Sequence, residues 1–177
     1  DAQRLWLTRT DGRWHATGRP DPWNKSPARS GCFKQAFQRK FAFVYGTGGT
    51  REENAWAYAK ARFDAETFWY RGNGAIALVP DSDYSLARTS DDNVIVYGNE
   101  TTNSVWAALA RGCPLRVERN RLALGARRFI GADHGVLFIR PRPNSAEASV
   151  GFVGGTGLAG MRSVERLPVF VSGVGYP

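Results

Sequence analysis

The 177-residue chain has the size of one domain, and its 42% hydrophobic and 12% aromatic residues are enough for a packed core. No apolar run approaches the roughly 20 residues that a membrane-spanning helix needs, so the sequence predicts no membrane segment. The formal net charge of +8 suggests nucleic-acid binding, but the basic residues gather in residues 1–40 and 114–142, whereas residues 81–100 are acidic. Nucleic-acid binding is therefore a minor alternative.

Residues 1–40 are predicted to form an N-terminal segment ahead of the main domain. Apolar residues on both sides of Asp11-Gly12 indicate a β-hairpin. The following stretch, residues 18–31, is rich in Pro and Gly, which disfavour helix and strand alike, so we expect an irregular strap. Phe33 and Phe37 indicate a short helix after it. The expected division is a hairpin and strap over residues 1–40 and an α/β domain over residues 41–177.

A βαβ unit is predicted next, and it favours a parallel sheet. Five apolar residues, 41–45, indicate a buried strand, and the apolar run at 75–79 indicates its parallel neighbour. Between them a helix starts after Thr50, which forms a capping box with Glu53. Helical spacing predicts that this helix packs on the sheet through one face, made up of Trp56, Ala59, Phe63, Thr67 and Tyr70.

The remainder of the chain adds further strands and two shorter helices. Leu115 to Leu124 alternates apolar with charged residues, which is typical of an antiparallel hairpin with one wet face. Other strands are expected at 94–97, 136–139, 149–153 and 169–171, and helices at 103–111 and 158–167. These elements predict a three-layer α/β sandwich of the Rossmann or flavodoxin type, with a mostly parallel sheet of five to six strands and an inserted hairpin.

A polar rim is predicted where the parallel strands end, because ligands of open α/β sheets bind beyond the carboxyl ends of the strands. Hydroxyls and amides dominate this rim, which suits a neutral hydroxylated ligand such as a sugar. The same composition is equally typical of an ordinary α/β loop surface, the favoured alternative. The candidate ligand cleft comprises Thr47, Gly48, Gly49, Thr50, Asp81, Asn99, Thr102, Asn103, Gly155, Thr156 and Gly157.

Two glycine-rich loops could serve phosphate binding. Residues 155–160 fit G-x-G-x-x-G between a strand and a helix, but no acidic residue follows the next strand, so a tight structural turn is favoured. Residues 46–50 lack the Lys-Ser/Thr ending of a Walker A loop. Their backbone N–H groups could hold an anion at the helix start, although Thr50 already caps that helix. A structural loop is again the favoured interpretation.

No catalytic, metal or cofactor site is predicted. The two histidines, His15 and His134, lie in unrelated settings, and no G-x-S-x-G elbow occurs. Asp81 and the nearby Asp83 are best explained as a solvated turn. Cys32 and Cys113 are isolated, which leaves two alternatives open: one disulfide, or two free thiols.

Several short runs resemble the C-terminal region of large exported bacterial serine hydrolases, usually described as prolyl-oligopeptidase-like peptidases or esterases. These runs lie at residues 11–14, 33–37, 43–47, 69–74, 96–99, 102–104 and 171–177. In that family the nucleophilic Ser, the Asp and the His belong to an upstream α/β-hydrolase domain. None of those motifs matches a position here, so the resemblance transfers no catalytic residue.

The resemblance implies a non-catalytic C-terminal module, exported to the periplasm or outside the cell. Its partner would be the upstream α/β-hydrolase domain of the same parent protein. The module would support domain packing, substrate access, or binding of a carbohydrate or peptide polymer. The alternative from another class is a small α/β enzyme or a nucleotide or anion binder that uses the glycine-rich loops.

Overall fold

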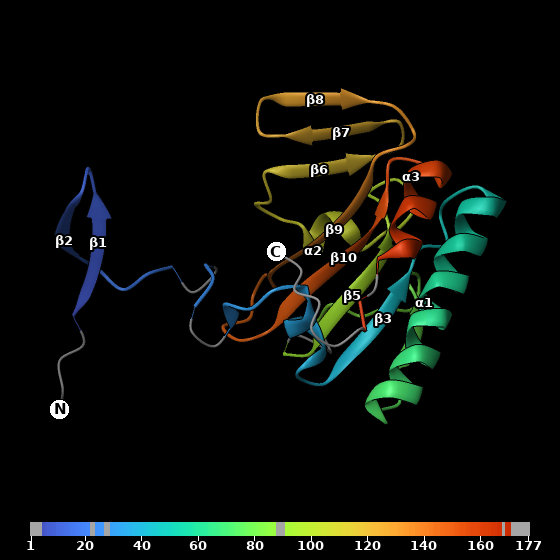
Figure 1. Cartoon of the computed structure of the whole chain (residues 1–177), viewed down its shortest axis with the longest axis horizontal. Coiled ribbons are helices and arrows are strands. Elements are labelled where there is room, and N and C mark those ends of the chain that lie inside the picture. Colours follow the sequence, from blue (N-terminus) through green and yellow to red (C-terminus); the bar gives the residue numbers. More distant parts are fainter. Residues whose placement is uncertain (1–4, 22–23, 27–28, 88–90, 168, 171–177) are drawn as a thin grey trace.

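The computed structural model describes residues 5–21, 24–26, 29–87, 91–167 and 169–170. Its central element is a mixed five-stranded sheet, in which four strands are parallel and the edge strand β9 is antiparallel (Figure 1). Helices pack against this sheet, and two small antiparallel sheets accompany it, so the α/β class and the mostly parallel sheet are confirmed. The order across the sheet is β4 (Ala77–Pro80), β3 (Phe41–Tyr45), β5 (Asn93–Gly98), β10 (Ser149–Gly155) and β9 (Gly135–Pro141).

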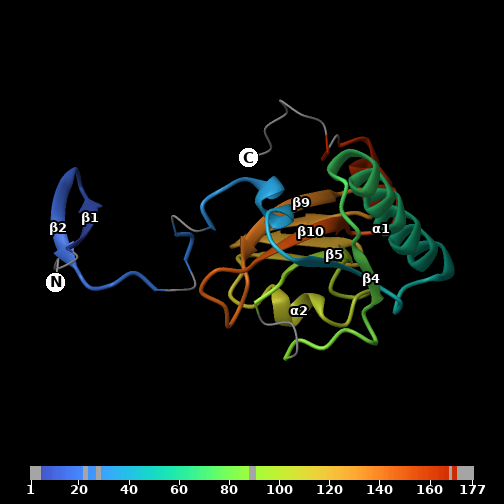
Figure 2. The ribbon, with the colours of Figure 1, turned by 90° about the horizontal axis from the view of Figure 1, so that it is seen from below.

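Each face of the sheet builds its own apolar cluster, because successive strand residues point to opposite sides. On β3, Phe43 joins one cluster and Val44 the other. The first cluster packs against α1 (Arg51–Gly72), α3 (Leu158–Ser163) and the 3-10 turns η2 (Phe33–Phe37) and η3 (Val164–Arg166). The second packs against α2 (Trp106–Leu109), and Figure 2 shows α1 and α2 on opposite sides of the sheet.

The long helix α1 begins as predicted. The side chain of Thr50 accepts a hydrogen bond from the backbone N–H of Glu53, and the Glu53 carboxylate accepts one from the backbone N–H of Thr50. The helix ends at Gly72, and the next residue, Asn73, adopts the left-handed conformation that stops many helices. The capping box therefore fixes the point at which the chain leaves the sheet and turns into the helix.

The predicted sheet-facing side of α1 is largely wrong. Of its members Trp56 is buried, but Phe63 and Tyr70 are 60% and 82% exposed, and Ala59 is exposed as well. The helix is rotated so that Ala57, Ala61 and Ala65 lie against the core, together with the polar residues Glu53, Lys60 and Asp64. Small side chains let the helix axis approach the sheet closely, which the larger aromatic residues would prevent.

Three smaller predictions change in the structure. Helix α2 is confined to Trp106–Leu109, and before it the side chain of Asn103 accepts a hydrogen bond from the backbone N–H of Val105 in a turn. The hairpin β6 (Leu115–Glu118) and β7 (Arg121–Leu124) gains a third strand, β8 (Arg127–Ile130), all of whose residues are exposed. Residues 169–170 form a turn rather than a strand, and Val171 lies outside the described residues.

The N-terminal hairpin of β1 (Trp6–Thr10) and β2 (Arg13–Thr17) forms as predicted, with Asp11 and Gly12 in the turn. It lies away from the sheet and is connected to it by the strap, as Figures 1 and 2 both show. Leu7 and Trp14 on this hairpin are 53% and 65% exposed. A two-stranded hairpin on its own is marginally stable in water, and the described part of the chain leaves both side chains exposed.

Candidate functional site

The loops that follow β3 and β5 meet at the carboxyl edge of the sheet, where the sequence places the ligand cleft. The backbone N–H of Gly48 donates to the carbonyl of Thr102 over 3.0 Å. A Cβ atom on Gly46 would lie 2.4 Å from the same carbonyl. The two loops are therefore in direct backbone contact at the edge where a ligand of such a sheet would bind.

Asp81, at the end of β4, joins these loops with its carboxylate. One oxygen accepts hydrogen bonds from the backbone N–H and the hydroxyl of Thr47, at 2.9 and 2.6 Å, and the other accepts from the backbone N–H of Ser104 at 2.6 Å. Burial alone would raise the pKa of Asp81, but the hydrogen bonds from Ser104 and Thr47 hold it below its ordinary value. The ionised carboxylate is thus a structural tie, not the solvated turn that the sequence suggested.

Replacing Asp81 with Asn is expected to lower the free energy of unfolding by about 2–3 kcal/mol at pH 7, because an NH2 group would face backbone N–H donors. The lowered pKa also sets the direction in which stability changes with pH. The stabilisation by Asp81 is present above the unfolded-state pKa and is lost as the pH falls through the folded-state value. Urea unfolding between pH 7 and pH 3 measures both effects. An equal pH dependence in the wild type and in D81N would contradict the proposed tie.

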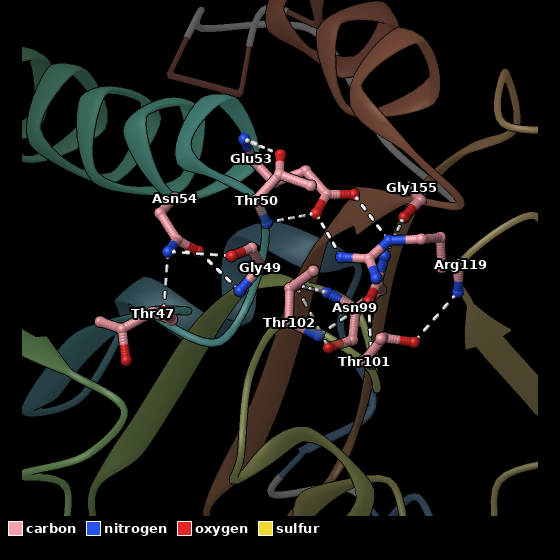
Figure 3. A network of polar contacts seen from close by, with 10 residues as sticks. All are labelled: Thr47, Gly49, Thr50, Glu53, Asn54, Asn99, Thr101, Thr102, Arg119 and Gly155. Atoms are coloured by element: carbon pink, nitrogen blue, oxygen red, sulfur yellow. Dashed lines mark hydrogen bonds and ion pairs between the residues drawn. The ribbon is translucent and has the colours of Figure 1, made fainter.

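The side-chain amides of the rim form hydrogen bonds with the backbone of the chain itself. Asn99 donates from Nδ2 to the carbonyl of Gly155 at 2.8 Å, and its Oδ1 accepts from the backbone N–H groups of Thr101 and Thr102 (Figure 3). Asn103 donates to two strand carbonyls at 3.2 and 3.1 Å. Both asparagines are almost completely buried. They lock the end of β5 to its neighbours and present no amide to an incoming ligand.

The glycine loop after β3 has no backbone donor left for an anion between Thr47 and Thr50. The backbone N–H groups of these four residues donate in turn to Asp81, the Thr102 carbonyl, the Asn54 side chain and Glu53. Asn54 also donates back to the carbonyl of Thr47, as Figure 3 shows. The loop therefore resembles a phosphate-binding loop in composition only, because protein oxygens already take its donors.

A protein carboxylate also lies at the start of α1. Glu53 forms an ion pair with Arg119 from the β6–β7 turn, with 2.5 Å between Nη2 and Oε2 (Figure 3). Burial opposes ionisation of Glu53, yet Arg119 and Thr50 together lower its pKa below the ordinary value. The positive end of the helix dipole is thus matched by the chain's own anion, and the pair fastens the small antiparallel sheet to the rim.

The second glycine motif serves close packing. A Cβ atom on Gly160 would lie 2.3 Å from the His134 carbonyl, and one on Gly155 would lie 2.5 Å from the backbone of Gly160. Gly157 approaches Ala132 in the same manner. The hydroxyl of Thr156 donates to the Gly131 carbonyl at 2.6 Å. Helix α3 therefore lies directly against the chain segment before β9, and the structural interpretation of G-x-G-x-x-G accounts for all three glycines.

The structure contains a buried charged cluster that the sequence analysis missed. Under α1, the Lys60 ammonium lies 2.7 Å from the Asp64 carboxylate, and the Tyr97 hydroxyl donates to Asp64 at 3.1 Å. Burial raises the pKa of Asp64 despite the opposing effect of Lys60, and burial also raises the pKa of Tyr97 well above its ordinary value. The i, i+4 spacing of Lys60 and Asp64 was the available signal, but exposed helix pairs share it.

A cavity of about 260 Å³ opens beside this cluster, lined by Ala59, Lys60, Phe63 and Glu165. Lys60 forms an ion pair with Asp64, so the cavity wall consists of a paired ammonium group, the carboxylate of Glu165 and apolar surface.

The two cysteines are free thiols in the structure. Cys32 precedes Phe33, which belongs to the cluster under α1, whereas Cys113 packs with the cluster on the α2 side. No disulfide joins the two cysteines in this structure. Within the described ranges, His, Cys, Asp and Glu form no group suited to a metal ion, and no helix there could cross a bilayer. No protein-family model matches the sequence, and no curated protein matches it.

Proposed function

We propose that the chain is a non-catalytic packing module of an exported serine hydrolase, which binds the upstream α/β-hydrolase domain of the same parent protein. The resemblance in sequence motivates the parent and its exported location. The observation that carries the packing role is the outer face of α1. Phe63, Trp69 and Tyr70 are 60%, 65% and 82% exposed there, although large aromatic residues normally gain by burial.

The arrangement of the rim supports a scaffolding role over a ligand-binding one. If the five strands are numbered by their order in the chain, the sheet begins with strands 2-1-3 (β4, β3, β5), as in flavodoxin-like folds. We propose a three-layer sandwich of that type, in which the last two strands in the chain, β9 and β10, pair antiparallel. In such folds the ligand lies at the switch point between the first and third strands. Here Thr102 and Gly48 meet at that point, which speaks against the nucleotide or anion binder that uses the glycine-rich loops.

Association with the hydrolase domain tests the proposal. The W69A/Y70A variant of the chain is expected to bind the separately expressed upstream domain at least about tenfold more weakly, because buried aromatic anchors dominate protein interfaces. Its own thermal unfolding should change little, since both side chains are exposed in the isolated chain. Isothermal titration calorimetry gives the affinity and calorimetric unfolding gives the stability.

A matched control uses apolar residues on a different surface. Phe129 and Ile130 of β8 are 41% and 75% exposed, and F129A/I130A should leave the association intact. Hydrolysis of ester or peptidyl substrates by the isolated chain, or the absence of any association with the upstream domain, would refute the packing proposal.

A further inference from the structure

A second cavity, of about 310 Å³, lies at the opposite end of the sheet from the glycine loops. Arg140 near the end of β9 pairs with Val150 near the start of β10, which places it at the amino edge of the parallel strands. Arg111 approaches from the chain that follows α2. The cavity falls within the size range of small-molecule sites, roughly 300–1,000 Å³. It is lined by Asp21, Asn24, Arg111, Gly112, Arg140, Pro141 and Pro143.

Arg140 of this cavity has a buried guanidinium N–H group without a partner, whereas several other arginines of the described surface are ion-paired. Arg116, Arg119 and Arg121 each form an ion pair with a glutamate. The side chains of Arg111 and Arg140 form no hydrogen bond or ion pair with any residue that the structure describes, and the Nη1 atom of Arg140 is buried without a partner. A buried guanidinium N–H without an acceptor is unfavourable, so an oxygen-bearing partner at this place would relieve that cost.

We propose that this cavity binds a small organic anion through Arg111 and Arg140. A guanidinium presents a fork of N–H donors that fits the two oxygens of a carboxylate or phosphate group. Pro141 and Pro143 offer apolar wall for the body of such a ligand, and Asn24 offers an amide. Asp21 lies on the same lining and opposes a second negative charge there. Carboxylate and phosphate share this chemistry, and the test separates them.

Thermal unfolding of the whole chain is measured with sodium citrate, inorganic phosphate or glucose, at constant ionic strength maintained with sodium chloride. A ligand of the folded state raises the melting temperature in proportion to the logarithm of its concentration once the site fills. We expect this logarithmic rise with citrate, phosphate or both, and none with glucose. The more effective anion identifies the group that the site prefers.

Variants locate the effect. R111Q and R140Q should each weaken anion binding by about tenfold or more, which is the usual effect of losing a hydrogen bond to a charged group. Arg111 is exposed, so R111Q retains the fold even if R140Q does not. R127Q removes an equal charge from β8, far from the cavity in sequence, and should bind like the wild type. Equal anion affinity in R111Q and R127Q, or no anion effect at all, would overturn the proposal.

Discussion

Replacing Asp64 with Leu while Lys60 stays is expected to lower the free energy of unfolding by about 3–5 kcal/mol, because a buried ammonium would lose its counter-charge. Both side chains are about 5% exposed or less, and Tyr97 would lose its acceptor as well. The expected loss is large against a total stability of about 5–15 kcal/mol for a domain. Urea unfolding at pH 7, followed by tryptophan fluorescence, measures it.

The K60M/D64L/Y97F variant should recover most of that loss, because no buried polar group of the cluster is then left unpaired. The matched control is E66L. Arg62 and Glu66 have the same spacing on the same helix and the same 2.7 Å separation, but both are about 60% exposed. E66L should leave the unfolding free energy unchanged within error. A D64L variant as stable as E66L would show that burial does not govern the cluster.

The pH dependence separates this cluster from the rim. The raised pKa of Asp64 means that ionising its carboxyl costs more in the folded chain, so this linkage favours folding below the unfolded-state pKa and the favourable effect is lost as the pH rises through the folded-state value, whereas the ion pair with Lys60 remains. Asp81 and Glu53, with lowered pKa values, act in the opposite direction. The triple variant should therefore lose less stability than the wild type when the pH rises through the weakly acidic range.

Local signals in the sequence located the elements well. Apolar runs marked the core strands, the capping box marked the start of α1, and Asp11-Gly12 marked the hairpin. The capping box and the turn can be recognised because their hydrogen bonds join residues that are close in the chain. The core strands can be recognised because their apolar residues are consecutive. Strand β8 was not predicted from the sequence, because all of its residues are exposed and an exposed strand shows no alternation of buried and exposed residues.

The orientation of α1 and the state of the rim could not be read in that way. Helical spacing gives two candidate faces for α1, one aromatic and one of alanines with charged residues, and hydrophobicity alone favours the aromatic face. Tertiary contacts decide otherwise, since Tyr97 on β5 provides a partner for Asp64. The parallel-sheet rule brought the rim residues together correctly. It could not show that Asp81, Asn99 and Asn103 bond to the chain itself, because their partners are far apart in sequence.

Replacing Gly154 with Ala is expected to cost at least about 3 kcal/mol of stability, through forced displacement of two core strands. A Cβ atom there would lie 1.7 Å from the carbonyl oxygen of Gly98, and this neighbour is backbone that cannot rotate away. Gly98 has a φ of +129°, so it is itself poorly placed to adjust. Chemical unfolding of G154A against the wild type gives the difference.

Two further glycine-to-alanine substitutions serve as comparisons for G154A. On the same strand, a Cβ atom on Gly151 would meet side-chain atoms of Phe33 and Ile95 at 3.0 and 3.3 Å, and these can shift, so G151A should cost less. Gly18 in the strap has no atom within 4 Å and should tolerate Ala. A G154A variant with the stability of G18A would mean that the ends of β5 and β10 are not in backbone contact.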